Sequence, residues 1–279
     1  MRLLFALLLL AQPALAAPKV AATIPPLAGL VAEVMQGIGT PAALMPANAE
    51  PHSFSLRPSQ MSALREADIV FAVGLDLEPW LERVDGDFTV VELADTASEP
   101  LMARNFDLSA RTEPDPHLWL DPGEMILWEL AMTQTLIERD PANTAAYRAN
   151  EFALLKTLVA AKERLAEIGA EMNAAGIRLV VSHDAFQYLE RRLGVPLAGM
   201  LLDFTETRAG ARTLSKITQL SGPICVIETA EFGAPPDLLP EAPRVVIDPM
   251  GAAYDGMPDF PARYYQGVAD ALQGCLTAP

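Results

Sequence analysis

Histidine is the residue type in this sequence whose chemistry is easiest to isolate. The chain has three, His52, His117 and His183. His52 lies in the turn-rich segment 49–59, His117 lies between prolines, and His183 follows the apolar run 178–182. A neutral imidazole is a good zinc ligand, and three such nitrogens with one carboxylate oxygen or water complete a tetrahedral site. The three histidines are therefore candidate metal ligands.

The fourth ligand is expected from the chain after His183. Asp248 directly follows the apolar run 244–247, and Glu228 follows the run 224–227 in the same way. Because ligand sites of open α/β folds lie at the carboxyl ends of the strands, a carboxylate there would share an edge with His183. We favour Asp248, with Glu228 and water as alternatives.

These ligands would come from four distant segments, since no short-range zinc motif such as H-E-x-x-H is present. Spacing alone is therefore weak evidence for the site. Two acidic residues near the histidines, Glu50 and Asp184, could orient a ring by accepting its second N–H, although surface solvation is an equal alternative.

Short apolar or β-branched runs alternate with helical stretches in two groups. This alternation predicts an α/β fold with largely parallel sheets. The runs expected to form strands are 19–24, 69–73, 88–93, 178–181, 224–227 and 244–247.

One long helix is predicted between the two groups. Apolar residues recur at helical spacing over 141–175, with no proline after Pro141 and no glycine before Gly169. We therefore expect an N-terminal lobe at 17–140, a stiff linking helix at 141–176 and a C-terminal lobe at 177–279.

The first residues have the features of a secretory signal. Arg2, a short apolar run and the small residues ending at Ala16 predict cleavage after Ala16. No cysteine follows for lipid attachment, and no later run reaches the roughly 18 apolar residues that a membrane span needs. We expect a periplasmic monomer that is not embedded in the membrane. In an oxidising compartment its two cysteines, Cys225 and Cys275, are expected to form a disulfide.

The overall charge excludes one class of partner. The formal net charge is −16, which repels nucleic acid. The Walker sequence G-x-x-x-x-G-K-[ST] and the G-x-S-x-G elbow are both absent from the sequence. Any transport would therefore be powered by a partner, and serine hydrolysis is not supported.

The chain resembles the zinc-uptake ABC-transporter binding proteins, the ZnuA/TroA family, in four segments. These are the His52 segment, which ends with Ser55–Ser59, and the segments 115–122, 181–186 and 247–251. The resemblance runs from about 20 to 276. It implies two α/β lobes joined by a long rigid helix and one metal ion in the cleft between them. It also implies delivery of the ion to a membrane permease that a cytoplasmic ATPase drives.

The resemblance also assigns residues. The family's metal-binding histidines match His52, His117 and His183, and its aspartate matches Asp248. The cysteines match a disulfide pair of the zinc members. Manganese members tend to carry Glu where His183 stands, so the resemblance favours Zn²⁺ as the transported ligand, in agreement with ligand softness.

Two departures and two alternatives accompany this reading. The His/Asp-rich loop of many zinc members is absent from 86–111, which makes an auxiliary zinc site doubtful. The helix after the first ligand starts Pro58-Ser59-Gln60 rather than Pro-Ser-Asp, with Ser59 as its expected cap. The alternatives are a manganese-specific member of the family and a secreted zinc hydrolase, since three histidines and an open position also describe a catalytic zinc site.

Overall fold

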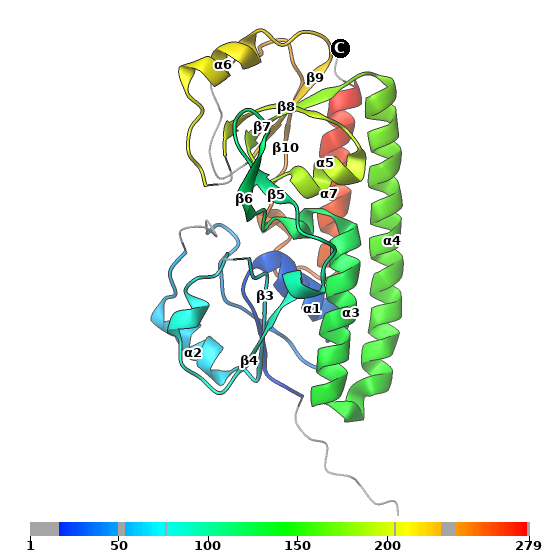
Figure 1. The fold of residues 1–279 in the computed structure, drawn as a ribbon. Coiled ribbons are helices and arrows are strands. Elements are labelled where there is room, and N and C mark those ends of the chain that lie inside the picture. Colours follow the sequence, from blue (N-terminus) through cyan, green and yellow to red (C-terminus); the bar gives the residue numbers. More distant parts are fainter. Residues whose placement is uncertain (1–16, 50–53, 76, 204, 230–237, 278–279) are drawn as a thin grey trace, which may run out of the picture.

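The computed structural model describes residues 17–49, 54–75, 77–203, 205–229 and 238–277. Two α/β lobes lie one above the other, and long helices run along one side of both (Figure 1). The expected signal peptide, Glu50 and His52 lie outside the described residues. The fold class expected from the sequence, two lobes with parallel sheets and one long helix, is confirmed.

The N-terminal lobe contains a parallel sheet in the order β2-β1-β3-β4. Three of these strands fall within predicted runs, whereas β2 is only two residues long and was not predicted. The elements of this lobe are β1 (Val20–Ala22), α1 (Pro25–Val34), β2 (Ala42–Ala43), α2 (Pro58–Glu66), β3 (Ile69–Ala72) and β4 (Thr89–Glu92).

The start of α2 corrects one detail of the sequence analysis. The expected cap Ser59 lies inside the first turn, because Pro58 occupies the first helical position and its fixed φ suits that place. The side chain of Gln60 reaches back instead, and its Oε1 accepts the Arg57 N–H at 2.7 Å.

The C-terminal lobe contains a second parallel sheet in the order β10-β9-β7-β8. Strand β8 was not predicted, since its sequence LAGMLL lacks β-branched residues and contains a glycine. The elements are β7 (Arg178–His183), α5 (Gln187–Leu193), β8 (Leu197–Leu202), α6 (Ala211–Thr218), β9 (Ile224–Glu228) and β10 (Arg244–Val246).

Three long helices, α3 (Pro122–Arg139), α4 (Thr144–Ala174) and α7 (Phe260–Thr277), run beside the lobes (Figure 1). Helix α4 has 31 residues, which gives a length of about 46 Å. It starts at Thr144 because Pro141–Asn143 forms a 3-10 turn. In the described part of the chain, no helix is long and apolar enough to cross a membrane.

Helix α4 is packed against both lobes. It contacts α1 and α3 from the first half of the chain and α5 and α7 from the second. At Gly169 a side-chain carbon would stand 2.0 Å from the Leu193 carbonyl oxygen, so the lack of a side chain there lets the end of α5 approach α4. The predicted disulfide is confirmed and joins Cys225 of β9 to Cys275 of α7, with their Cα atoms 5.5 Å apart.

A short antiparallel hairpin between the lobes was not predicted. It consists of β5 (Met102–Arg104) and β6 (Ala110–Pro114) and appears in green near the middle of Figure 1. Gln187 of α5 donates through Nε2 to the Met102 carbonyl oxygen at 3.0 Å. The hairpin therefore belongs to the first half of the sequence but is anchored on the second lobe.

Candidate metal site

His117 lies at the end of the hairpin, three residues after β6, and is 2% exposed. Its Nδ1 lies 2.7 Å from Asp115 Oδ1, which also accepts the His117 backbone N–H at 3.0 Å. Because an ionised carboxylate only accepts, a neutral ring in this position would carry its proton on Nδ1 and its lone pair on Nε2. A carboxylate in this position fixes the tautomer and orientation of a metal-binding histidine.

Asp115 is itself held from the second lobe. Gln187 Nε2 donates to its Oδ2 at 3.0 Å, and the Tyr188 hydroxyl donates to its carbonyl oxygen at 3.1 Å. Asp115 is 0% exposed. The group that orients His117 is therefore close in sequence and also fixed by helix α5.

His183 is the last residue of β7 and is 3% exposed. In register it pairs with Leu202, so Asp203 follows at the end of the neighbouring strand. The Nδ1 of His183 lies 3.0 Å from the Asp203 carbonyl oxygen. Since a carbonyl can only accept, the neutral ring would also carry its proton on Nδ1 and its lone pair on Nε2.

The two histidine rings lie together although they come from opposite sides of α4 in the sequence. Their centroids are 5.6 Å apart and their planes are at 80°. Zinc–nitrogen distances of about 2.0–2.1 Å in a tetrahedral site place two ligating rings with centroids about 5 Å apart. The observed separation suits two ligands of one ion.

The structure brings the two histidines together, but it does not complete the proposed set of four. Among the described residues, no group of three or more His, Cys, Asp or Glu side chains is placed to hold a metal ion. The first proposed ligand, His52, lies outside those residues. The carboxylate of Asp248 accepts the backbone N–H groups of Met250 at 2.9 Å and Ala252 at 2.6 Å. The full ligand set stays a prediction.

The alternative carboxylate, Glu228, has a different environment. Its Oε1 is paired with Arg244 of the adjacent strand β10. Among the described residues, by contrast, the hydrogen bonds to the Asp248 carboxylate come from backbone N–H groups alone, and each of its oxygens keeps a further lone pair. A metal would therefore have to compete with a guanidinium at Glu228 but not at Asp248.

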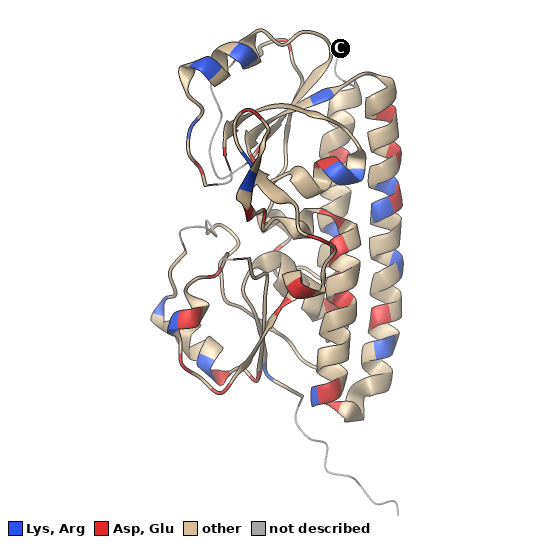
Figure 2. Ribbon diagram, in the orientation of Figure 1, with Lys and Arg blue, Asp and Glu red and all other residues tan. Residues whose placement is uncertain are grey.

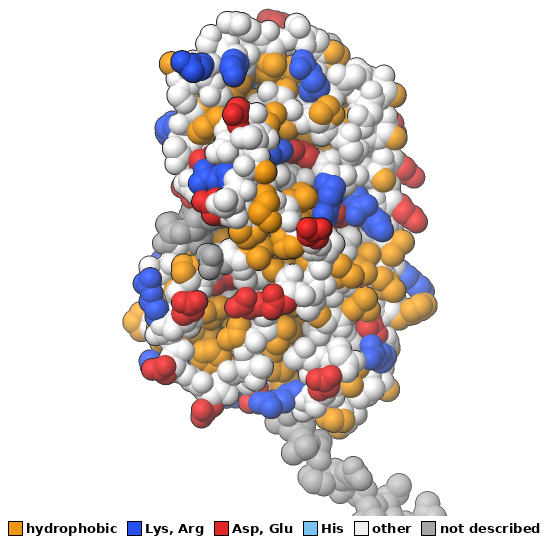
Figure 3. Space-filling model, viewed as in Figure 1, with side chains coloured by type: hydrophobic (Ala, Val, Ile, Leu, Met, Phe, Trp, Pro, Cys, Tyr) orange, Lys and Arg blue, Asp and Glu red, His pale blue; other side chains and the backbone are white. Residues whose placement is uncertain are grey.

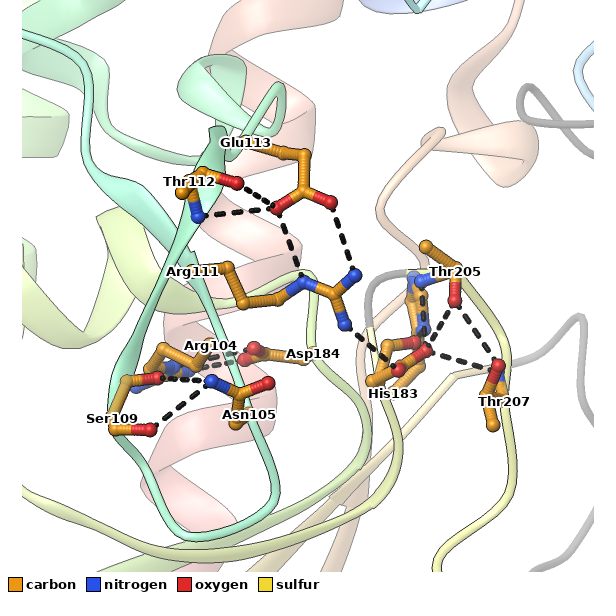
Figure 4. A network of polar contacts seen from close by, with 11 residues as sticks. Arg104, Asn105, Ser109, Arg111, Thr112, Glu113, His183, Asp184, Thr205 and Thr207 are labelled. Atoms are coloured by element: carbon orange, nitrogen blue, oxygen red, sulfur yellow. Dashed lines mark hydrogen bonds and ion pairs between the residues drawn. The ribbon is translucent and has the colours of Figure 1, made fainter.

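Asp184, expected as a possible partner of a histidine, has another role. It is fully buried and ion-paired with Arg104 of β5 (Figure 4). Arg104 also binds Glu190, with Nη1 2.7 Å from Oε2. Burial raises the pKa of Asp184 to about 6, against the opposing effect of Arg104. The ring of His183 is oriented by Asp203 instead.

Charges of both signs alternate over the molecule rather than separating into one patch. Figure 2 shows acidic and basic residues interspersed along α4 and around α5, and the surface in Figure 3 has the same mixture. Near the site, Arg191 and Arg192 of α5 bind Asp121 at 3.0 and 2.8 Å. The acidic excess therefore does not by itself mark the binding site.

Comparison with known proteins assigns the family. The model of the family described as "Zinc-uptake complex component A periplasmic", ZnuA, matches residues 20–221. The chain belongs to this family. A crystal structure of ZnuA has the same fold, with a TM-score of 0.74 and 22% identity over 91% of this chain and 99% of that chain.

Two curated relatives differ in the metal that they name. The high-affinity zinc uptake system protein ZnuA of Paracoccus denitrificans is 28% identical over 311 residues, which cover 94% of this chain and 92% of that protein. The manganese-binding lipoprotein MntA of Halalkalibacterium halodurans is 28% identical over 193 residues, covering 67% and 62%. Members of the family are metal-binding proteins of ABC transporters rather than enzymes. The hydrolase alternative is therefore set aside.

Proposed function

We propose that this protein captures Zn²⁺ in the periplasm and delivers it to the membrane permease of an ABC importer, which a cytoplasmic ATPase drives. The observation that carries the proposal is the pair of buried rings of His117 and His183, 5.6 Å apart. In each ring Nδ1 is engaged by an oxygen acceptor, so we assign Nε2 as the nitrogen that would bind the metal.

The proposed ligands are His52, His117, His183 and Asp248. Imidazole-rich sites favour zinc, whereas carboxylate and water ligands suit manganese. Because one relative is a manganese-binding lipoprotein, manganese transport is the second candidate function of this protein. We favour Asp248 over Glu228 as the fourth ligand because Arg244 already occupies Glu228.

Two of the segments that carry proposed ligands are already held together by hydrogen bonds before metal binds. Trp119 Nε1 donates to the Pro249 carbonyl oxygen at 2.8 Å, and the Tyr265 hydroxyl donates to the Trp119 carbonyl oxygen at 2.7 Å. These contacts tie the segment after His117 to the segment after Asp248 and to helix α7. With α4 beside both lobes, we expect small shifts and local ordering rather than a wide hinge motion.

Calorimetric titration of the metal-free protein with Zn²⁺ and Mn²⁺ tests the proposal. We expect a stoichiometry near one for zinc, loss of that binding in His183→Ala, and a shift of preference toward manganese in His183→Glu. Wild-type protein that binds manganese but not zinc would contradict the zinc assignment. Asp248→Asn paired with Glu228→Gln identifies the fourth ligand, because only the first change is expected to weaken binding.

The same titration at different pH values tests the imidazole ligands. Because a histidine must be neutral to bind zinc, affinity should fall as pH drops below about 6 to 6.5. Unchanged zinc affinity between pH 7.5 and 5 would contradict a site built from three histidines.

A further inference from the structure

We propose that Arg111 is a positioning residue for zinc binding, which acts by holding Asp203 and through it the ring of His183. The inference rests on the proposed zinc site and goes beyond its ligands. Arg111 belongs to the hairpin strand β6, whereas Asp203 and His183 belong to the C-terminal lobe. Figure 4 shows Arg111 and His183 with Thr205 and Thr207 of the turn that follows β8.

The ring of His183 depends on the position of one backbone carbonyl. Its Nδ1 has the Asp203 carbonyl oxygen at 3.0 Å. That oxygen also accepts the Glu206 N–H at 2.9 Å, so it belongs to a tight turn rather than to the sheet. If the turn moved, the acceptor that keeps the proton on Nδ1 would move with it.

The turn is organised by the side chain of Asp203. Its Oδ1 accepts the backbone N–H of Thr205 at 2.9 Å, the Thr205 hydroxyl at 2.8 Å and the backbone N–H of Thr207 at 3.0 Å. Within the turn, Glu206 has φ of +63°, a conformation that a residue with a side chain seldom adopts. The turn therefore contains one residue in an unfavourable backbone conformation, and the contacts of the Asp203 side chain stabilise it.

Arg111 contacts the Asp203 side chain from the hairpin. Its Nη1 lies 3.6 Å from Asp203 Oδ2, the oxygen that the turn does not use. The guanidinium is fixed on its other side by Glu113, with Nη2 3.2 Å from Oε1. This contact lowers the pKa of Glu113 to about 2. The side chains of Asp203 and Arg111 are 7% and 26% exposed, so their attraction is less screened than that of a surface pair.

The same hairpin also carries the other histidine. Strand β6 runs directly into Asp115 and His117, and Arg104 of β5 holds Asp184, the residue after His183. One hairpin therefore positions His117 through the chain itself and His183 through two arginines. Movement of the hairpin would disturb both proposed ligands at once, which couples the halves of the site.

The ring nitrogens of the metal-free protein report this positioning directly. Two-dimensional ¹H–¹⁵N spectra of the histidine rings distinguish a proton on Nδ1 from one on Nε2, and three histidines can be assigned. In Arg111→Gln we expect His183 to lose its single Nδ1–H tautomer while His117, held by Asp115, keeps its own. Zinc affinity measured by calorimetry should fall about tenfold, the lower end of the loss seen when a group that orients a metal ligand is removed.

Two variants complete the test. Arg111→Lys keeps the charge beside Asp203 and should retain most of the tautomer and the affinity. Arg164→Gln makes the same change of charge at an exposed ion pair on α4 and should change neither. A His183 tautomer that is unaffected by Arg111→Gln would overturn the proposal, and so would equal changes at His117 and His183, which would indicate general loosening. Wild-type protein with the expected tautomers but no zinc binding would overturn the proposed function alone.

Discussion

His117 and His183 present the same ring nitrogen, but different means hold them. His117 is oriented by a carboxylate two residues earlier, which is fully buried and bound by Gln187. His183 is oriented by a backbone carbonyl twenty residues later, in a turn that depends on Asp203 and on Arg111 of the hairpin. The first arrangement is compact, whereas the second makes the position of the proposed ligand His183 depend on a distant element.

This difference predicts unequal tolerance to change. Around His117 a carboxylate adds charge to the orienting hydrogen bond, which strengthens it. Around His183 the orienting bond is neutral, and its placement depends on ion pairs across the lobe boundary. We therefore expect substitutions far from the rings to affect His183 more than His117.

The largest effect is expected from Arg104→Met, which acts on the His183 side. The change would leave the carboxylates of Asp184 and Glu190, which are 0% and 8% exposed, without their shared cation. Loss of one partner from a buried ion pair costs about 3–5 kcal/mol of folding free energy. Urea unfolding followed by tryptophan fluorescence measures this cost.

Two further variants distinguish the loss of the Arg104 ion pairs from a loss of side-chain packing. The triple variant Arg104→Met, Asp184→Asn, Glu190→Gln removes the unpaired charges and should regain much of the lost stability. Arg164→Gln, at an exposed pair, should cost no more than about 1 kcal/mol. A loss below that value for Arg104→Met would show that the hairpin is not a support of the His183 side.

The second largest effect is expected at Glu129 of helix α3, outside both histidine environments. A change there should alter folding stability without altering either ring. Glu129 is 0% exposed, and within the described residues its two carboxyl oxygens and the hydroxyl of Thr133 have no hydrogen-bond partner. Burial, with a smaller contribution from Glu151, raises the pKa of Glu129 to about 8. In the unfolded chain the pKa of a glutamate is about 4.3.

The sign of the pH effect follows from these two pKa values. Between them the folded protein keeps the Glu129 proton and the unfolded chain loses it, so this residue's contribution to stability falls as pH rises. Between pH 5.5 and 7.5 the loss is about 2–3 kcal/mol at about 1.4 kcal/mol per pH unit. Glu129→Gln should therefore become progressively more stable than the wild type over that range, as measured by urea unfolding.

Glu138→Gln, an exposed change on the same helix, provides the control and should show a constant difference from the wild type. The ring tautomers of His117 and His183 should be unaffected by Glu129→Gln. A stability difference independent of pH would mean that Glu129 is ionised in the folded protein.

The sequence made parts of this architecture predictable because apolar periodicity reports burial. The runs around β1, β3, β7 and β9 and the long helix α4 bury apolar residues. Strands β4 and β10 are largely exposed, and their β-branched residues made them predictable. The hairpin β5–β6 escaped prediction because its strands are short and largely exposed. Its position is set by Arg104 and by contacts with α5, which no local pattern contains.

The two histidine environments differ in the same respect. Asp115 could have been suspected as the partner of His117, since an acidic residue two positions away is visible in the sequence. Asp203 could not, because it acts through a backbone carbonyl that every residue possesses. Only the register of β7 with β8, which pairs His183 with Leu202, brings that carbonyl to the ring.

The smallest of the three effects is expected from Asp115→Asn and Asp203→Asn. These two changes compare the groups that orient His117 and His183 most directly. The first change removes the charge beside His117 Nδ1 and lets an amide NH₂ face the ring, which favours the wrong tautomer. Loss of such a partner costs about 10–100-fold in metal affinity. Asp203→Asn keeps Oδ1 as the acceptor of the turn and weakens the attraction of Arg111 to Oδ2. The carbonyl that orients His183 should therefore shift only partly, and calorimetry should show a smaller loss of zinc affinity. If Asp203→Asn cost more than Asp115→Asn, the charge of Asp203 rather than its backbone oxygen would govern His183, and the two histidines would depend on carboxylates equally.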